Sequence, residues 1–309
     1  MREGLYRSTL KSGSIMSGYY RYSDVFQIIQ SKKEISIKNE KYLDIEYNQA
    51  YGNALHLELS SNGEDEEFYV NRMSELSHLD FLKELIALLS IVTNEYYDLD
   101  FEKEVNIRPT DQEAIESFSD ISLPLIRKDP DRVRQRQNFT MSFVSIHPAA
   151  DDFFKNYFRL NAEARSRYNA SIFLYESMRK ILLTSASMAI IGLISAIENL
   201  MDFDSAKAGK NSELCKECNQ TVYSISKRFK EFMLEFSEFE VDNKNSLLNK
   251  FYSRRSKISH TGGILEIDRL LSKFNMAEHR EFTEIESHVR IALFNYLLKY
   301  KFSDEAITK

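Results

Sequence analysis

The chain has 309 residues, 43% of them hydrophobic, so it is long enough for two domains with buried cores. Charged residues make up 28%, and no apolar run approaches the ~20 residues of a membrane span, so we expect a soluble protein without membrane contacts. The start, M-R-E-G-L-Y-R-S, lacks a signal-peptide core, and two cysteines are typical of a reducing compartment, which predicts a cytoplasmic location.

The net charge of -6 is distributed unevenly along the chain. Residues 1–150 contain 17 Lys and Arg against 25 Asp and Glu, a net of -8, and the remainder contains 24 against 22, a net of +2. The C-terminal half therefore tolerates a polyanion better. Neither half is basic enough for tight non-specific binding to nucleic acid, so an RNA site would have to depend on a local patch.

The sequence pattern of residues 1–105 predicts a small β-rich, α+β domain. Short runs of β-branched and aromatic residues alternate with turn-like sequences, and a helix is expected over residues 79–97. The predicted strands are Val25–Ile29, Glu34–Ile37, Tyr42–Tyr47, Ala54–Leu59 and Glu67–Val70.

All four prolines lie between residues 109 and 148, which indicates a proline-containing connector over residues 106–148. Its basic end has two interpretations, a solvated connector helix or an arm that touches phosphates. The basic residues are Arg127, Lys128, Arg132, Arg134 and Arg136.

Helical periodicity dominates from residue 149 to residue 309. The predicted fold class is therefore α+β, with the β-rich domain followed by an all-α bundle. The expected helices are Ala149–Leu160, Ala162–Leu183, Ser187–Met201, Ser224–Phe236, Lys244–Ser259, Ile264–Phe274 and Glu281–Tyr300.

An arginine falls on the apolar stripe of the helix expected at Lys244–Ser259. Leu248, Phe251, Tyr252, Ile258 and Ser259 follow helical spacing, and Arg255 lies on the same stripe. Burying an arginine is costly without an anion, so we expect a carboxylate or a phosphate beside it.

His260 lies at or just past the end of this helix, because Gly262 and Gly263 indicate a C-cap. On an ideal helix, five residues separate Arg255 from His260 by about 140°. The two side chains would converge only if the helix end unwinds or a second copy of the helix faces it.

This segment resembles the R-x4-6-H signature of the HEPN superfamily and, more narrowly, its Apea-like branch. Tyr252, Arg255, Ser256 and His260 match the branch pattern Tyr-x-x-Arg-Ser-x-x-x-His in place, and Arg254 offers a second register. The resemblance covers roughly residues 150–305.

The resemblance implies a HEPN-type helical bundle that acts as a dimeric, metal-independent RNA endonuclease with no cofactor. It would leave 2′,3′-cyclic phosphate and 5′-OH ends, with His260 as general acid or base and Arg255 stabilising the developing charge. Arg254 would bind a flanking phosphate. The supporting positions are Tyr252, Ser256, Lys257, Glu198 and Asn199.

Glu198 is the expected partner of Arg255. It borders the apolar face of G-L-I-S-A-I-E-N-L-M, which is similar to an Ala-(Leu/Ile)-Glu-x-Leu stretch of Apea-like members. The family also suggests a role in antiviral defence or as a toxin, with residues 1–105 sensing a regulatory partner or a phage trigger.

Two other functions remain open. A non-catalytic HEPN module would bind RNA or a nucleotide; Ser256, where many catalytic members have Asn, Asp or His, and the acidic net charge favour it. A purely structural interaction domain would use the arginines in salt bridges.

Cys215 and Cys218 have zinc-knuckle spacing but form a single pair, whereas a structural zinc site needs four ligands. Free thiols, a redox pair and a zinc site shared between two subunits all remain open. The usual zinc-protease, P-loop, Rossmann and serine-hydrolase motifs are missing from the sequence.

Overall fold

The computed structural model describes residues 4–31, 41–52, 66–99, 112–135, 143–182, 184–207, 225–238, 244–268 and 276–302. The chain forms two compact units. Unit 1 contains Met1–Arg132 and Asn138–Phe154, and unit 2 contains Val133–Gln137 and Lys155–Lys309. The α+β class is confirmed, because an N-terminal antiparallel sheet is followed by a helical region.

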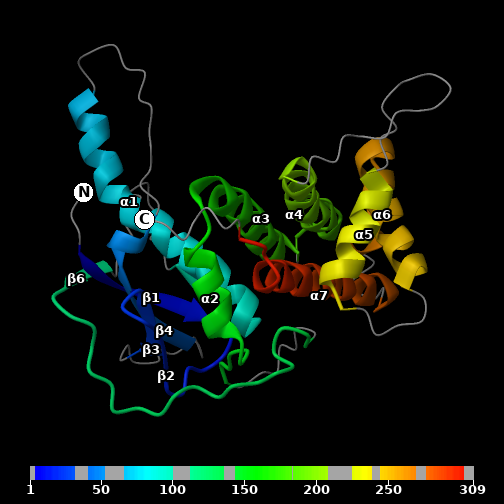
Figure 1. The fold of residues 1–309 in the computed structure, drawn as a ribbon. Coiled ribbons are helices and arrows are strands. Elements are labelled where there is room, and N and C mark those ends of the chain that lie inside the picture. Colours follow the sequence, from blue (N-terminus) through cyan, green and yellow to red (C-terminus); the bar gives the residue numbers. More distant parts are fainter. Residues whose placement is uncertain are drawn as a thin grey trace. The chain divides into compact units, whose positions relative to one another are not determined.

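Unit 1 is built on an antiparallel sheet in the order β2-β3-β4-β1-β5, with β6 also paired to β1 (Figure 1). The strands are β1 (Leu5–Ser12), β2 (Tyr19–Tyr22), β3 (Phe26–Gln30), β4 (Lys41–Asn48), β5 (Tyr97–Leu99) and β6 (Gln112–Ile115). A 3-10 turn, η1 (Gln49–Tyr51), follows β4.

One face of this sheet carries the core of unit 1. Alternate residues of β1 are buried, as expected for a strand with one face covered. The ring of Phe81 on α1 (Glu66–Thr93) lies 6.1 Å from that of Tyr47 on β4. At the start of α2 (Ala150–Phe158), the ring of Phe154 lies 4.9 Å from that of Phe26.

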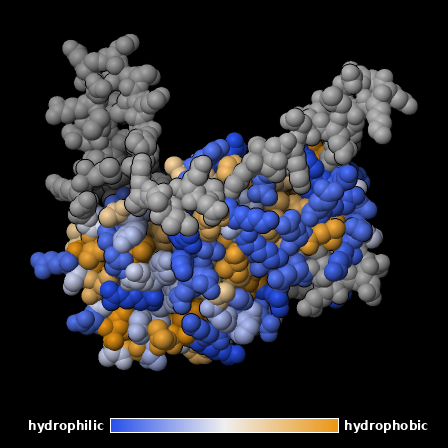
Figure 2. All heavy atoms as spheres, viewed as in Figure 1, coloured by the Kyte–Doolittle hydropathy of each residue, from blue (hydrophilic) through white to orange (hydrophobic). Residues whose placement is uncertain are grey.

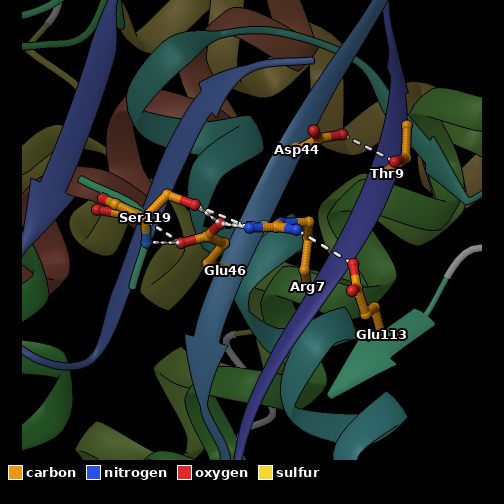
Figure 3. A network of polar contacts seen from close by, with 7 residues as sticks. Arg7, Thr9, Asp44, Glu46, Glu113 and Ser119 are labelled. Carbon is orange, nitrogen blue, oxygen red and sulfur yellow. Dashed lines mark hydrogen bonds and ion pairs between the residues drawn. The ribbon is translucent and has the colours of Figure 1, made fainter. Parts of the chain in front are cut away.

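The opposite face carries a row of polar side chains across five strands. The registers align Arg21, Gln27, Glu46, Arg7 and Glu113 in that order. Figure 3 shows Arg7 between two carboxylates, with ion pairs of 2.6 Å to Glu46 and 3.1 Å to Glu113. Such cross-strand pairs of opposite charge fix the strand register.

Part of the predicted connector covers this polar row. The backbone N and the hydroxyl of Ser119 donate to Glu46 over 2.8 and 2.7 Å (Figure 3). Gln27 donates to the Ser119 carbonyl. Farther along, the backbone N of Tyr19 donates to the Pro124 carbonyl, and the backbone N of Ile126 donates to the Tyr19 carbonyl. Most of the proline-containing segment therefore belongs to unit 1.

Two of the predicted strands match the structure, and one was wrong. Val25–Ile29 corresponds to β3 and Tyr42–Tyr47 to β4, whereas Glu67–Val70 lies inside α1, which extends the expected helix toward its N-terminus. Helix propagation is cooperative, so a short β-like run adjoining a stable helix joins it. Residues 34–37 and 54–59 lie outside the described residues.

The connector helix was also wrong for the residues that the structure describes. Residues 112–135 contain β6 and turns, and Arg132 is buried, with bonds to the Thr93 carbonyl and to Glu95. Arg132 therefore serves the core of unit 1, so it cannot contribute to an arm that touches phosphates. Arg134 pairs with Glu238 in unit 2, and Arg136 lies outside the described residues.

Unit 2 is a helical bundle around α4, which contacts α3, α5, α6 and α7. Its elements after α2 are α3 (Ala162–Ile181), α4 (Ala186–Lys207), α5 (Ile225–Phe236), α6 (Lys244–Thr261), η2 (Glu266–Asp268) and α7 (Met276–Leu298). In place of the helix expected at Ile264–Phe274, the structure has the short η2, and residues 269–275 are not described.

Among the described helices, α4 is long and apolar enough to cross a membrane by length and composition. Most of that window, 61%, is buried in the structure, as in the core helix of a soluble protein. The face drawn in Figure 2 is largely hydrophilic, with smaller hydrophobic areas between.

A buried ionic cluster ties the short segment Val133–Gln137 to α7. Arg290 is fully buried and donates to the carbonyls of Val133 and Gln135 over 2.9 and 2.6 Å. It also pairs with Glu286 at 2.6 Å. Each nitrogen of this guanidinium therefore has an acceptor, as burial of a charge requires.

Candidate functional site

The helix α6 has a narrow buried face formed by Leu248, Phe251 and Ile258. It stays helical through Thr261, and Gly262 follows with φ 63°, which confirms the predicted C-cap. Ser259, which we placed on the apolar stripe, is exposed. The buried stripe is thus narrower than the spacing predicted, because polar side chains flank it.

Helix α6 carries five Lys and Arg residues and no acidic residue. Its positive charge must therefore be balanced by neighbouring helices or by a ligand. Helix α4 supplies Glu198 and helix α7 supplies Glu281, one for each of the two adjacent arginines.

Arg255 pairs with Glu198, so the expected anionic partner is confirmed. The Nη2 of Arg255 donates to Oε2 of Glu198 over 3.0 Å, and the two side chains are 24% and 16% exposed. Tyr252 donates to Oε1 of the same carboxylate over 3.3 Å. Burial and the charge of Glu198 raise the pKa of Tyr252, which keeps its hydroxyl protonated as a donor.

The guanidinium of Arg255 is incompletely bonded. Its Nε is buried and has no hydrogen-bond partner among the described residues. By contrast, Arg290 in the same bundle donates from Nε, Nη1 and Nη2. A buried donor without an acceptor is unfavourable by roughly 1–3 kcal/mol, and such groups in folded proteins call for a functional explanation.

Arg254 points to the other side of α6. Its Nε donates to Oε1 of Glu281 over 3.0 Å, and Lys250 pairs with Oε2 of the same carboxylate at 3.0 Å. Glu281 is buried and was missed by sequence reasoning. It lies four residues before Ile285, which begins a run of apolar residues at i+4 spacing with Val289 and Leu293, and that spacing could have revealed it.

His260 lies on the exposed side of α6. It makes no hydrogen bond or ion pair with the part of the chain that the structure describes. Ser256, four residues earlier, is half-buried, and Lys257, three residues earlier, is exposed. These three side chains share one side of the helix, away from the buried stripe.

The chain after His260 is held against the start of α4. The carboxylate of Asp268 accepts from the backbone N of Ala186 and of Ser187 over 2.6 and 2.9 Å. The hydroxyl of Ser187 in turn accepts from the backbone N of Leu265. A carboxylate at a helix N-terminus is stabilised by the unpaired N–H groups there, so this loop fixes the end of α6.

Because α6 remains helical through His260, the expected separation of about 140° from Arg255 holds within one chain. The alternative in which the helix end unwinds is therefore wrong. The structure brings together Arg255, Tyr252 and Glu198, and separately Arg254 with Glu281.

Asn199 is directed to α3 rather than to α6. Its Nδ2 donates to the Arg167 carbonyl and to the Ser171 hydroxyl, both over 2.8 Å. Cys215 and Cys218 lie outside the described residues. Within the described residues, no group of three or more His, Cys, Asp and Glu side chains could hold a metal ion.

No family model, curated protein or solved structure matches the chain.

Proposed function

We propose that unit 2 is a metal-independent RNA endonuclease of HEPN type, acting in the cytoplasm as a homodimer. The single observation that supports this proposal best is the incomplete bonding of Arg255. An arginine that serves only packing is expected to resemble Arg290, with every nitrogen bonded. Arg255 instead retains donor capacity beside a partly exposed carboxylate.

In this proposal the two signature residues have separate tasks. His260 takes the proton of the ribose 2′-OH or supplies one to the leaving 5′-oxygen, since an imidazole can both accept and donate a proton. The planar fork of Arg255 binds the phosphate and stabilises the charge that develops on it. The products carry 2′,3′-cyclic phosphate and 5′-OH ends.

The helical geometry supports a site shared by two subunits. Arg255 and His260 lie on different sides of an intact helix, so one copy of α6 cannot readily aim both at one phosphate. The histidine of one subunit can meet the arginine of another if two such helices face each other. Unit 1 is then the regulatory part, responding to a partner or a trigger, by analogy with defence nucleases of the family.

A second function has its own support. Glu198 and Glu281 neutralise both arginines, and Ser256 follows Arg255 where many catalytic members carry a different polar residue. These features favour a module that binds RNA or a nucleotide without cleaving it.

The test is RNA cleavage by the purified chain in EDTA, with analysis of the 3′ ends. We expect cleavage to survive chelation, and Arg255→Ala and His260→Ala each to lower the rate by roughly 100-fold or more. Arg159→Ala, which removes an exposed arginine packed on the Phe302 ring, is the control and should cleave normally. Equal cleavage by all variants would refute the assignment.

Mixing the two inactive variants tests the shared site. A dimer that pairs Arg255→Ala with His260→Ala retains one arginine and one histidine that can meet across the interface, so activity should return in part. Failure of the mixture to recover activity, with dimers shown by sedimentation, would contradict a shared site. RNA binding that persists in His260→Ala without cleavage by the unaltered chain would establish the binding module instead.

A further inference from the structure

We propose that Tyr252 is a positioning residue that keeps Arg255 from closing fully on Glu198, so that the guanidinium can take an RNA phosphate. This inference rests on the proposed function, because it concerns the phosphate subsite of the same site. The tyrosine acts through the carboxylate rather than on the substrate.

The Glu198 carboxylate is divided between two donors. Oε2 accepts from Nη2 of Arg255 over 3.0 Å, and Oε1 accepts from the hydroxyl of Tyr252 over 3.3 Å. An arginine and a carboxylate often pair through two parallel bonds, which needs both oxygens for the guanidinium. Tyr252 holds Oε1, the second oxygen that such a fork would use, toward its own hydroxyl.

This arrangement leaves Arg255 with a single bond to Glu198, and its Nε is buried without an acceptor among the described residues. Because Nε itself is buried, a phosphate oxygen would reach Arg255 through the exposed part of its side chain, which is 24% exposed as a whole. A phosphate would therefore meet an arginine that is only partly satisfied, and binding would lose fewer existing bonds.

Tyr252 is held in place by a neighbouring ring and by its position on α6. Its ring lies 5.4 Å from the ring of Phe229 on α5, and it precedes Arg255 by three residues on the same helix. Burial and the charge of Glu198 raise its pKa, so the hydroxyl remains a donor over the working range of an imidazole. The tyrosine is thus held where it can compete with Arg255 for the carboxylate.

The experiment is Tyr252→Phe in the full-length chain, with binding of a single-stranded RNA oligonucleotide measured by fluorescence anisotropy. Without the hydroxyl, Glu198 is free to bond both Nε and Nη2, and affinity for RNA should fall by roughly fivefold. Adding Glu198→Gln should restore it, because a neutral amide holds the guanidinium less tightly. The matched control is Tyr296→Phe, which removes another tyrosine–carboxylate bond, to Asp204, and should not alter affinity.

A second readout follows Arg255 without any RNA. The ¹⁵N–¹H signal of its Nε, assigned by its loss in Arg255→Lys, should shift in Tyr252→Phe as the nitrogen gains an acceptor. Urea unfolding of this variant should match the unaltered chain, whereas a merely structural tyrosine would lower stability and RNA binding together.

The outcomes separate this inference from the proposed function. RNA binding by the unaltered chain, with an unchanged Nε signal in Tyr252→Phe, would overturn the inference alone. A loss of affinity that Glu198→Gln does not restore would do the same. A chain that binds no RNA at all would overturn the proposed function and the phosphate role of Tyr252 together.

Discussion

Two carboxylates of unit 2 hold arginines in different ways, one of them buried (Glu286) and the other half-buried (Glu198). Glu286 accepts from Arg290 and from Tyr175, both over 2.6 Å, and Arg179 lies 3.4 Å from it. Glu198 divides its two oxygens between Tyr252 and Arg255. The first arrangement is almost fully buried, with Arg179 and Glu286 3% and 4% exposed, whereas Arg255 and Glu198 are 24% and 16% exposed.

Glu286 should make the stability of unit 2 depend on pH. Burial by itself raises the pKa of Glu286, but the charges of Arg290 and Arg179 outweigh burial and hold the pKa below its ordinary value. A carboxylate with a lowered folded pKa stabilises fully above its unfolded pKa, about 4.3, and this contribution is lost as pH falls through the folded value.

We therefore expect Glu286→Gln to lower the free energy of unfolding at pH 7 by about 3–5 kcal/mol, because two buried arginines lose their charged partner. As pH falls below about 4.3, the free energy of unfolding should decrease less in the variant than in the unaltered chain. Urea unfolding at pH 7 and at acidic pH measures both effects. Glu284→Gln, at a half-buried position on the same helix, is the control, and an equal response from both variants would contradict the assignment.

At the scale of single elements, the end of α6 is set by one glycine. Gly262 has φ 63°, a left-handed conformation, while a Cβ at that position would meet nothing within 4 Å. The requirement for glycine is therefore conformational rather than steric. This residue lies two positions after His260, so the helix end and the proposed site are determined together.

Gly262→Ala should lower the free energy of unfolding by about 1 kcal/mol, and Gly262→Asn by less, since asparagine tolerates the left-handed conformation better. Thermal unfolding of both variants measures the difference. Gly263→Ala is the neighbouring control, because Gly263 does not have a positive φ. A larger loss from Gly263→Ala than from Gly262→Ala would show that packing, not backbone conformation, fixes this turn.

Elements were predictable where periodicity was strong. Apart from the one at Ile264–Phe274, the helices expected after residue 149 overlap the observed ones, because their buried faces repeat at helical spacing, as Ile285, Val289 and Leu293 do on α7. Strand β1 was missed, because it carries Arg7, Thr9 and Lys11 on its polar face and serines among its buried positions. Its partners come from residues far along the chain, which local patterns do not reveal.

At the scale of the whole molecule, the chain crosses between its units more than once. Residues Val133–Gln137 belong to unit 2, while the segments before and after them belong to unit 1. The carbonyls of Val133 and Gln135 accept from Arg290, which is fully buried. The sequence-based boundary at residue 149 would separate this segment from the bundle that uses it.

A fragment of residues 149–309 should therefore be less stable than one of residues 133–309. In the shorter fragment, Nε and Nη2 of Arg290 lose their acceptors, and each unsatisfied donor costs about 1–3 kcal/mol. Urea unfolding of the two fragments measures the difference. Arg290→Met should reduce the difference in free energy of unfolding between the two fragments. Equal stability of the two fragments with Arg290 in place would show that the segment is dispensable.

The sequence by itself determined the fold class, the C-cap at Gly262 and the need of Arg255 for an anionic partner. These follow from local rules, namely helical spacing, glycine conformation and the cost of burying a charge. Only the tertiary structure decided that Glu198 is shared with Tyr252, that Glu281 takes Arg254 and that Val133–Gln137 joins the bundle. Those contacts join residues distant in sequence, and they depend on how whole helices pack rather than on any local pattern.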